Sequence, residues 1–296
     1  MDLSIIIVSY NSEEFISKCL NSFSALNPDL DIEIIVVDNA SQDASGDLIR
    51  KDFPGVRLIS NSANLGYAKA CNQGIKEAKG RYIFILNPDT ELSRGSLEAI
   101  IRFMDENPRC GILGPKLLDK DGKIQFSCRA FPSYSTAFFN RYSLLTKIFP
   151  GSRYAQRYLK ASWPHDSIQE TDWVSGAAML IRRDCLGQIG NFDERFFMYC
   201  EDIDMCQRAR ENGWQVFYYP YVEFTHFIAG SVKNTSHLTI IWHHQSIWRY
   251  YKKYLRANIL CDAFFFVTTF TRAIFLSCFR LIGNSLTLHN NKKCEK

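Results

Sequence analysis

The stretch "YIFILNPDTEL" (residues 82–92) changes character abruptly, and this change decides which fold the sequence predicts. Residues 82–86 form a continuous apolar run, which is typical of a parallel strand buried on both faces. The run stops at Asn87-Pro88-Asp89, where an amide, a proline and a carboxylate follow one another. Two interpretations are open: an ordinary turn, or a position at which a sheet delivers an acid to chemistry.

Similar apolar runs recur before this strand, with helical segments between them. Residues 3–9, 32–37, 56–60 and 81–86 predict four buried strands, and residues 13–25 have apolar side chains at helical spacing. The alternation of strands and helices predicts βαβ units and a mostly parallel central sheet flanked by helices, in the α/β class.

Polar side chains follow all four predicted strands. The four strand ends are Ser9-Tyr10-Asn11, Asp38-Asn39, Asn61 with Asn64-Leu65-Gly66, and Asn87-Pro88-Asp89. Right-handed crossovers bring the carboxyl ends of parallel strands to one edge of the sheet, where ligands of such sheets bind. The sequence therefore predicts one polar crevice at this edge.

The chain continues with further helices and strands. We expect a helix over residues 93–107, strands over 110–118, 172–183 and 215–220, a loop leading into a helix over 192–214, and a helix over 238–256. Residues 119–170 are aromatic and poorly periodic, and we interpret them as a flexible region that shapes the substrate site.

The charge of the chain is unevenly distributed. The 296 residues carry a net charge of +4, but residues 230–296 hold ten Lys and Arg against two acids, which leaves the first 229 residues at −4. A basic, aromatic tail predicts an anionic partner surface, either a membrane or a nucleic acid, with a solvated basic face as the alternative. No nucleic-acid recognition motif accompanies the tail, so we expect no nucleic-acid partner.

Residues 259–282 are strongly apolar yet contain polar side chains. At helical spacing Asp262, Thr269, Arg272, Ser277 and Arg280 fall on one side. This pattern predicts an amphipathic helix lying in a membrane interface rather than spanning it, and the alternative is a helix packed on the protein's own core.

Cysteines and the N-terminus bear on the compartment. Ten cysteines occur singly without a CxxC pair, so a disulfide framework and a cysteine metal cluster are both unexpected. The apolar run near the N-terminus is too short for a signal peptide. We expect a cytoplasmic protein that is peripheral to the cytoplasmic membrane.

Six segments together resemble glycosyltransferase family 2, which has the GT-A fold, and within it the rhamnosyltransferase-like branch. The segments are "SIIIVSYNSEEFISKCLNS", "IIVVDNASQD", "NLGYAKACNQGI", "YIFILNPDTEL", "VSGAAMLIRR" and "FFMYCEDIDMCQRARENGW". The resemblance implies a catalytic domain over residues 1–230, and residues 231–296 then form a helical, membrane-associating extension.

The resemblance implies a nucleotide site at the first strands. Asp38 is expected to accept a hydrogen bond from a pyrimidine base, and Ser9 and Tyr10 to line the base and ribose. Asn64, Gly66 and Asn72 match the segment that contacts the nucleoside, and Gly66 would allow close backbone approach to the ligand. The alternative is that these Asn and Gly residues form turns and caps.

The resemblance also implies a divalent metal, Mn²⁺ or Mg²⁺, on the sugar-nucleotide diphosphate. The family's metal motif is Asp-x-Asp, whereas this chain has Asn87 at the first position and Asp89 at the last. Asp89 is the expected metal carboxylate, Asn87 a neutral contributor, and His226 the histidine that completes the site.

The acid cluster after residue 200 matches the family's catalytic base. Asp202 is the expected base that takes the proton of the acceptor hydroxyl, Glu201 its positioning partner, and Asp204 a structural acid that points elsewhere. Trp173, Ser175 and Gly176 match the segment near the donor sugar and acceptor, where Trp173 could stack on a pyranose; an ordinary core strand is the alternative.

Together these features predict an inverting, metal-dependent glycosyltransferase. The expected donor is dTDP-rhamnose or a UDP-sugar, and the expected acceptor is a lipid-linked glycan of cell-surface polysaccharide biosynthesis, met at the membrane. The alternative is a non-catalytic carbohydrate-binding or scaffold protein with a degenerate site, which Asn87 permits.

Overall fold

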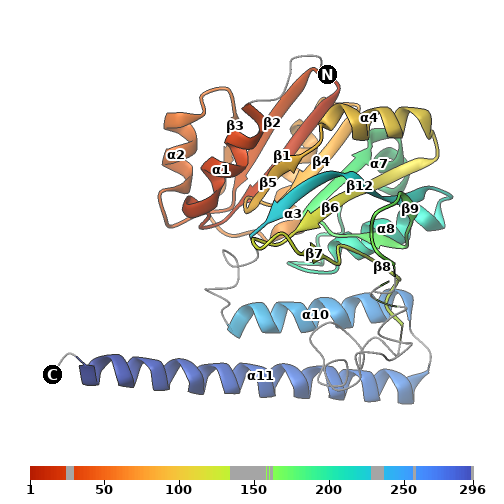
Figure 1. Ribbon diagram of the computed structural model, residues 1–296. Coiled ribbons are helices and arrows are strands. Elements are labelled where there is room, and N and C mark those ends of the chain that lie inside the picture. Colours follow the sequence, from red (N-terminus) through yellow and green to blue (C-terminus); the bar gives the residue numbers. More distant parts are fainter. Residues whose placement is uncertain are drawn as a thin grey trace.

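The computed structural model describes residues 1–24, 30–133, 158, 160, 163–227, 237–255 and 258–294, with side chains up to residue 278. One mixed sheet forms its centre, with the strand order β3-β2-β1-β4-β11-β6-β12-β5 (Figure 1). The first four strands in this order are parallel: β1 (Leu3–Ser9), β2 (Ile32–Asp38), β3 (Arg57–Ser60) and β4 (Tyr82–Leu86).

The other half of the sheet is mixed. It contains β5 (Thr90–Arg94), β6 (Cys110–Leu118), β11 (Ala178–Arg182) and β12 (Gln215–His226). β11 is antiparallel to β4 and β6, β6 is parallel to β12, and β12 is antiparallel to β5. Two short strands join the central sheet beside this order: β7 (Ile124–Gln125) pairs with β6, and β9 (Gln169–Glu170) pairs with β12. A separate two-stranded sheet is formed by β8 (Cys128–Arg129) and β10 (Trp173–Val174).

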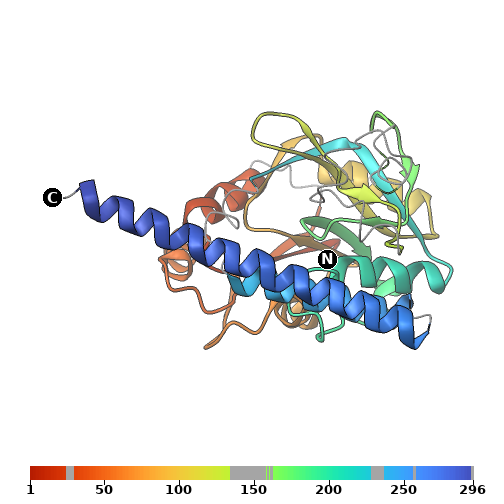
Figure 2. The same ribbon diagram turned by 90° about the horizontal axis from the view of Figure 1, so that it is seen from below.

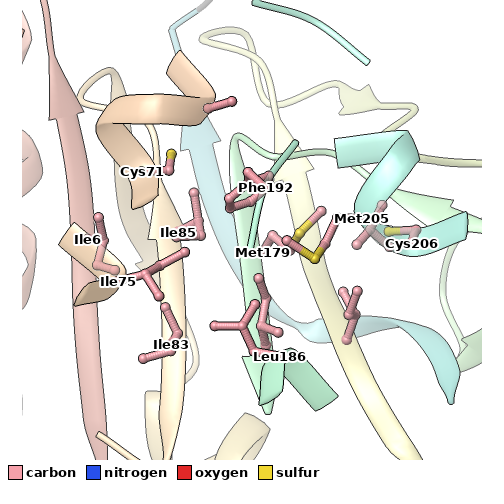
Figure 3. Close-up of a cluster of buried hydrophobic side chains, with 14 of the residues drawn as sticks. Ile6, Cys71, Ile75, Ile83, Ile85, Met179, Leu186, Phe192, Met205 and Cys206 are labelled. Atoms are coloured by element: carbon pink, nitrogen blue, oxygen red, sulfur yellow. The ribbon is translucent and has the colours of Figure 1, made fainter. Parts of the chain in front are cut away.

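Helices cover both faces of the sheet because each strand presents alternate apolar side chains to opposite faces. Ile6 and Ile85 belong to one buried cluster that includes side chains of α3 (Tyr67–Glu77), α7 (Arg183–Ile189) and α8 (Glu201–Glu211), part of which Figure 3 shows. Ile5, Ile7 and Phe84 face the other side, where α1 (Glu13–Ser24), α2 (Ser45–Asp52) and α4 (Leu97–Glu106) lie. Each fully buried side chain of this size contributes about 1.5–3 kcal/mol to the stability of the fold.

Three predicted elements differ from the observed ones. The helix expected from residue 93 begins at Leu97, because residues 90–94 pair with β12 as β5. The strand expected over 172–183 is broken into β10 and β11 by a turn at residues 175–177. The strand expected over 215–220 continues to His226. This extension places His226, the last residue of β12, opposite Thr90, the first residue of β5. The end of β12 therefore lies close to the turn that follows β4.

Two long helices follow the sheet. α10 (His237–Tyr254) packs on α8 and the loop before it, and α11 (Ile259–Cys294) runs back along α10 (Figure 1). Seen from below, α11 crosses the underside of the molecule (Figure 2). Residues 134–157, 159, 161 and 162 of the predicted substrate-shaping region lie outside the described residues.

Two polar side chains of α11, Asp262 and Thr269, face inward. Asp262 accepts a hydrogen bond from the Tyr251 hydroxyl at 3.1 Å and lies 3.7 Å from Lys252, and Thr269 is buried. Six large apolar side chains face outward, namely Ile259, Leu260, Phe264, Val267, Ile274 and Phe275, which are between 59% and 82% exposed. Phe265 instead stacks on Tyr251 of α10. By length and composition alone, Ile259–Cys278 is sufficient to cross a membrane, and 11% of its most apolar window is buried. The helix therefore packs on α10 rather than in the sheet's core.

Candidate active site

The carboxyl ends of β1, β2 and β4 meet at one edge of the sheet. Two residues that are not glycine, Asn11 and Ala40, adopt left-handed backbone conformations just past β1 and β2, with φ of 51° and 65°. Such conformations cost about 1–3 kcal/mol each and concentrate at functional sites. Asp38 ends β2, is 7% exposed and accepts a hydrogen bond from the Ser41 N–H.

Asn39 organises the loop after β3, a role that the sequence analysis did not assign. Its Nδ2 donates to Oδ1 of Asn64 at 2.9 Å, and its Oδ1 accepts from the N–H of Leu65 at 3.0 Å and from Asn61 at 3.1 Å. The side chain is 2% exposed, so these bonds form away from water. The only sequence signal was its position directly after Asp38 at a strand end.

Three further residues predicted to line the nucleotide differ in their exposure: Tyr10, Asn64 and Ser9. Tyr10 is 48% exposed at the edge and Asn64 is half-buried beside Asn39, so both lie near Asp38. Ser9 is buried, and its hydroxyl bonds that of Ser12 at 2.6 Å. Ser9 therefore packs beneath the edge with its hydroxyl already paired.

Gly66 is required by the protein itself. Its φ is +87°, and a Cβ at this position would lie 2.7 Å from the carbonyl oxygen of Phe197. The same carbonyl accepts the N–H of Tyr67 at 2.6 Å. The close approach of Phe197 therefore already requires glycine at this position, and the expected approach of a ligand to Gly66 stays a prediction.

Asn72 is not brought to the nucleotide edge. Its amide donates to the carbonyl oxygen of Phe192 at 2.9 Å and to Glu194 at 3.0 Å, and its Oδ1 accepts the N–H of Phe192 at 3.0 Å. These bonds hold the loop before α8 against α3. The alternative of a structural asparagine therefore fits Asn72 better than nucleoside contact.

Asn87, Asp89 and His226 converge where β4 and β12 end. Nε2 of His226 lies 3.3 Å from Oδ1 of Asp89 and 3.5 Å from Nδ2 of Asn87. Asp89 is 3% exposed, and its carbonyl oxygen accepts the N–H of Phe227 at 2.8 Å, which fixes the two chain segments together. The cluster joins residues almost 140 positions apart in the chain.

This cluster fits a divalent cation that a diphosphate also holds. Among the described residues no group of three His, Cys, Asp or Glu side chains is arranged to hold a metal ion. The cluster offers one carboxylate from Asp89, one imidazole from His226 and one amide from Asn87. Such a set suits Mn²⁺ or Mg²⁺ when phosphate oxygens supply further ligands. A histidine nitrogen and a carboxylate oxygen held 3.3 Å apart in a buried place accommodate a cation between them.

The predicted base, Asp202, lies in the first turn of α8. Tyr199 and Cys200 precede the helix with φ of 69° and 65°. These two consecutive left-handed residues set the direction in which the helix begins, and with it the positions of Glu201 and Asp202. Oδ2 of Asp202 accepts the N–H of Gly176 at 3.0 Å, and Oδ1 accepts the N–H of Ile203 at 2.8 Å. A Cβ on Gly176 would lie 3.3 Å from Cβ of Asp202, so the turn approaches the acid closely.

Burial shifts both acids of the pair. Burial raises the pKa of Asp202, against the hydrogen bonds from the N–H groups of Gly176 and Ile203 and the charge of Arg129. Burial and then the charge of Asp202 hold the pKa of Glu201 well above its usual range. Within the described part of the chain, nothing hydrogen-bonds Oε2 of Glu201. A raised pKa makes a carboxylate a stronger base once it is ionised.

Asp204 points away from this pair, as predicted. It is fully buried and bonds Arg208 at 2.9 Å, Lys253 at 2.6 Å and the hydroxyl of Tyr254 at 2.8 Å. Lys253 and Tyr254 belong to α10. Asp204 therefore fastens α10 to the helix that carries Asp202.

Tyr67 connects the two halves of the site, and the sequence analysis did not single it out. Its hydroxyl lies 3.0 Å from Oδ1 of Asn87 and 3.1 Å from the carbonyl oxygen of Gly176. Burial, then the charges of Cys71 and Glu201, raise its pKa well above the usual range, so the hydroxyl stays protonated. The only signal in the sequence was a tyrosine directly after Gly66.

Trp173 does not face the site. Its ring is 5% exposed, its indole N–H donates to the carbonyl oxygen of Ala130 at 2.8 Å, and the guanidinium of Arg129 lies 5.2 Å from the ring centre. The expectation that it stacks on a pyranose is therefore wrong for this conformation, in which Arg129 covers the ring. Ser175 is half-buried in the turn, and its hydroxyl accepts the N–H of Ala177 at 3.3 Å.

Solved structures with similar folds define the class of protein. The structure of GalNAc-T7 with UDP, GalNAc and Mn²⁺ matches with a TM-score of 0.58 and 14% identity, over 77% of this chain and 44% of that chain. The mannosyltransferase PcManGT from Pyrobaculum calidifontis, in complex with GDP-Man and Mn²⁺, matches with a TM-score of 0.56 and 16% identity, over 97% of this chain and 79% of that one. The chain has the GT-A fold, as the sequence predicted.

Sequence comparisons give the family. The profile described as "Glycosyl transferase family 2" matches residues 4–156, and "Glycosyl transferase family group 2" matches residues 82–286. N-acetylglucosaminyl-diphospho-decaprenol L-rhamnosyltransferase of Mycobacterium tuberculosis is 31% identical over 83% of this chain and 82% of its own length. Rhamnosyltransferase WbbL of Escherichia coli is 28% identical over 83% of this chain and 91% of its own length. The chain belongs to glycosyltransferase family 2 and is a rhamnosyltransferase-like glycosyltransferase.

Proposed function

We propose that this chain is an inverting, metal-dependent glycosyltransferase with Asp202 as its base. The observation that carries the proposal is the path from Asn87 through the Tyr67 hydroxyl and Gly176 to the Asp202 carboxylate. This path joins the Asp89–His226 cluster to the acid pair across one site. If the Asp89–His226 cluster and Asp202 lay on opposite sides of the molecule, they could not act on the same substrate.

The chemistry follows from this arrangement. Asp202 accepts the proton of the acceptor hydroxyl as that oxygen forms a bond to C1 of the sugar, and the C1–O bond to the diphosphate breaks on the opposite face. The nucleoside diphosphate leaves with the electron pair, so the configuration at C1 inverts. A bound Mn²⁺ or Mg²⁺, held by Asp89 and His226 with Asn87 beside them, supplies positive charge against that leaving group. Asp38 and Tyr10 face the nucleotide end.

The substrates are proposed from the relatives. The M. tuberculosis relative is an N-acetylglucosaminyl-diphospho-decaprenol L-rhamnosyltransferase, and WbbL is a rhamnosyltransferase. We therefore propose dTDP-rhamnose as donor, with a UDP-sugar as the second choice. The proposed acceptor is a hydroxyl of a lipid-linked glycan in cell-surface polysaccharide biosynthesis.

We further propose that residues 231–296 hold the catalytic domain, residues 1–230, on the cytoplasmic face of the membrane. The support is the orientation of α11: its polar side chains contact α10, and its large apolar side chains face outward. α11 runs antiparallel along α10, so in this packing it lies along the protein rather than crossing a bilayer (Figure 2).

Metal removal tests the catalytic proposal. EDTA is expected to abolish sugar transfer, and added Mn²⁺ or Mg²⁺ to restore it. Full transfer in metal-free buffer would exclude the role given to Asp89. The alternative is a non-catalytic carbohydrate-binding or scaffold protein. It predicts that dTDP-rhamnose and UDP-sugars are not hydrolysed when they are incubated with the protein and Mn²⁺ in the absence of an acceptor.

A further inference from the structure

Gln125 lies buried beneath the proposed metal cluster. It belongs to β7, which pairs with β6, and its side chain is only 6% exposed. Its amide makes three hydrogen bonds. Nε2 lies 2.8 Å from the carbonyl oxygen of His226 and 3.2 Å from that of Leu118, and Oε1 lies 2.9 Å from Nδ1 of His226.

These contacts fix which way the amide faces. Two carbonyl oxygens can only accept hydrogen bonds, so the amide group that meets both of them must be the NH₂ donor. The opposite orientation would place three oxygens against one another in a buried place, where unpaired polar groups are costly. The amide oxygen is therefore directed at Nδ1 of His226.

The orientation of the amide decides the tautomer of His226. An amide oxygen is an acceptor only, so Nδ1 must carry a proton and donate it. In the neutral ring Nε2 then presents its lone pair, and this atom lies 3.3 Å from the Asp89 carboxylate. Two electron-rich atoms that face each other at this distance form a pair of ligands that a cation can bridge.

We propose that Gln125 is the positioning residue of the metal site, which fixes His226 in the Nδ1–H tautomer with Nε2 ready to ligate. This inference rests on the proposed function, because it assigns Gln125 to the proposed Mn²⁺ or Mg²⁺ cluster. Gln125 also bonds Leu118 of β6, so the ring is held by the β6–β7 hairpin as well as by its own strand. Partners that orient a metal-binding histidine in this way typically contribute 10–100-fold to metal affinity.

The first test needs no metal. In protein labelled with ¹⁵N-histidine, the His226 signals are assigned by their loss in His226→Gln; at a pH at which the ring is neutral, they should show a protonated Nδ1 and an unprotonated Nε2. Gln125→Met has a side chain of similar length without donor or acceptor, and it should shift His226 toward the Nε2–H tautomer. A wild-type His226 in the Nε2–H form would overturn the proposal even if Gln125→Met fails to fold.

The second test measures Mn²⁺ affinity by titration calorimetry, first with Mn²⁺ alone and then with dTDP or UDP. Gln125→Met should bind Mn²⁺ about 10–100-fold more weakly than wild type. The matched control is Gln215→Met at the other end of β12, where the glutamine bonds Glu170, and it should bind as wild type does.

The outcomes separate the two proposals. If His226→Gln loses Mn²⁺ binding while Gln125→Met matches Gln215→Met, the role of Gln125 is wrong and the metal site stands. If His226→Gln and Asp89→Asn both bind Mn²⁺ as wild type does, the proposed metal site itself is wrong.

Discussion

The backbone N–H of Gly176 donates to Oδ2 of Asp202 over 3.0 Å, and this bond ties the turn between β10 and β11 to the first turn of α8. The carbonyl oxygen of the same glycine lies 3.1 Å from the Tyr67 hydroxyl, which also reaches Asn87. One peptide turn thus sets the position of the proposed base relative to the proposed metal cluster.

Removing the Tyr67 hydroxyl should loosen that arrangement. The single O–H of Tyr67 is shared between Oδ1 of Asn87 and the carbonyl oxygen of Gly176, so Tyr67→Phe removes one buried donor, and we expect about 1–3 kcal/mol lower stability in urea unfolding. We expect the rate of transfer to fall about tenfold while Mn²⁺ affinity changes less, because Tyr67 contacts neither Asp89 nor His226.

Tyr82→Phe is the matched control for Tyr67→Phe. The Tyr82 hydroxyl donates to Asp105 at 2.6 Å, away from the site, and the residue is equally aromatic and more deeply buried. Its loss should lower stability without changing the rate of transfer. Equal rates for the two variants would show that Tyr67 has no positioning role.

Glu201 should make stability depend on pH. Burial holds its pKa well above the usual range in the folded state. Between the unfolded and folded pKa values the folded protein retains a proton that the unfolded chain has lost, so stability falls as pH rises through this window, by about 1.4 kcal/mol per pH unit. Glu201→Gln has no titratable group at this position, so it lacks this contribution to the pH dependence of stability.

The stability difference between Glu201→Gln and wild type should therefore shift in favour of the variant as pH rises above about 4.5, where an unfolded glutamate ionises. Urea unfolding of both proteins at pH 4, 6 and 8 measures this difference. A difference that is constant across the three pH values would contradict the raised pKa.

Asp204 should contribute strongly to stability. It is fully buried between Arg208, Lys253 and Tyr254, so Asp204→Asn leaves two cations short of their partner and should cost about 3–5 kcal/mol in urea unfolding. Asp47→Asn removes an ion pair whose acid is 88% exposed and should stay within about 0.5 kcal/mol of wild type. Similar costs for both variants would refute the structural role of Asp204.

The outward face of α11 should bind lipid. Phe264 and Phe275 are 61% and 68% exposed, so replacing both with Glu should leave the fold intact. It should weaken binding to vesicles containing anionic lipid about 100-fold or more, since each buried phenylalanine contributes about 1.5–3 kcal/mol. Tyr221→Glu, which changes a 58% exposed aromatic on β12, serves as the control in the same flotation assay. Undiminished flotation of the double variant would exclude α11 as the lipid-binding surface.

The parallel half of the sheet was predictable because its strands are continuous apolar runs between helical segments. β5 was missed because "TELSR" has no apolar run of its own and forms a strand only through pairing with β12. The break at residues 175–177 was missed because Ser175, Gly176 and Ala177 are as compatible with an apolar strand as with a turn. These elements depend on tertiary pairing that local sequence does not encode.

Asp38, Asp89 and Asp202 could be proposed for the site because they end a strand, follow a strand or open a helix, and their roles stay predictions. Asn72 and Trp173 were assigned to ligands, but their polar groups bond Phe192 and Ala130 of the same chain. Tyr67 and Gln125 were overlooked because the partners that give them a place in the site, Gly176 and His226, are 109 and 101 residues away, and only the folded structure brings them together. Supporting residues of this kind carry no local signature.

The central claim is that Asp202 removes the acceptor's proton in a site that binds the donor independently of it. The direct measurement is the rate of sugar transfer by Asp202→Asn, alongside its affinity for the nucleotide sugar with Mn²⁺. Transfer should be lost, by at least about 10²–10⁴-fold, while donor affinity stays near that of wild type. Transfer at the wild-type rate by this variant would contradict the account.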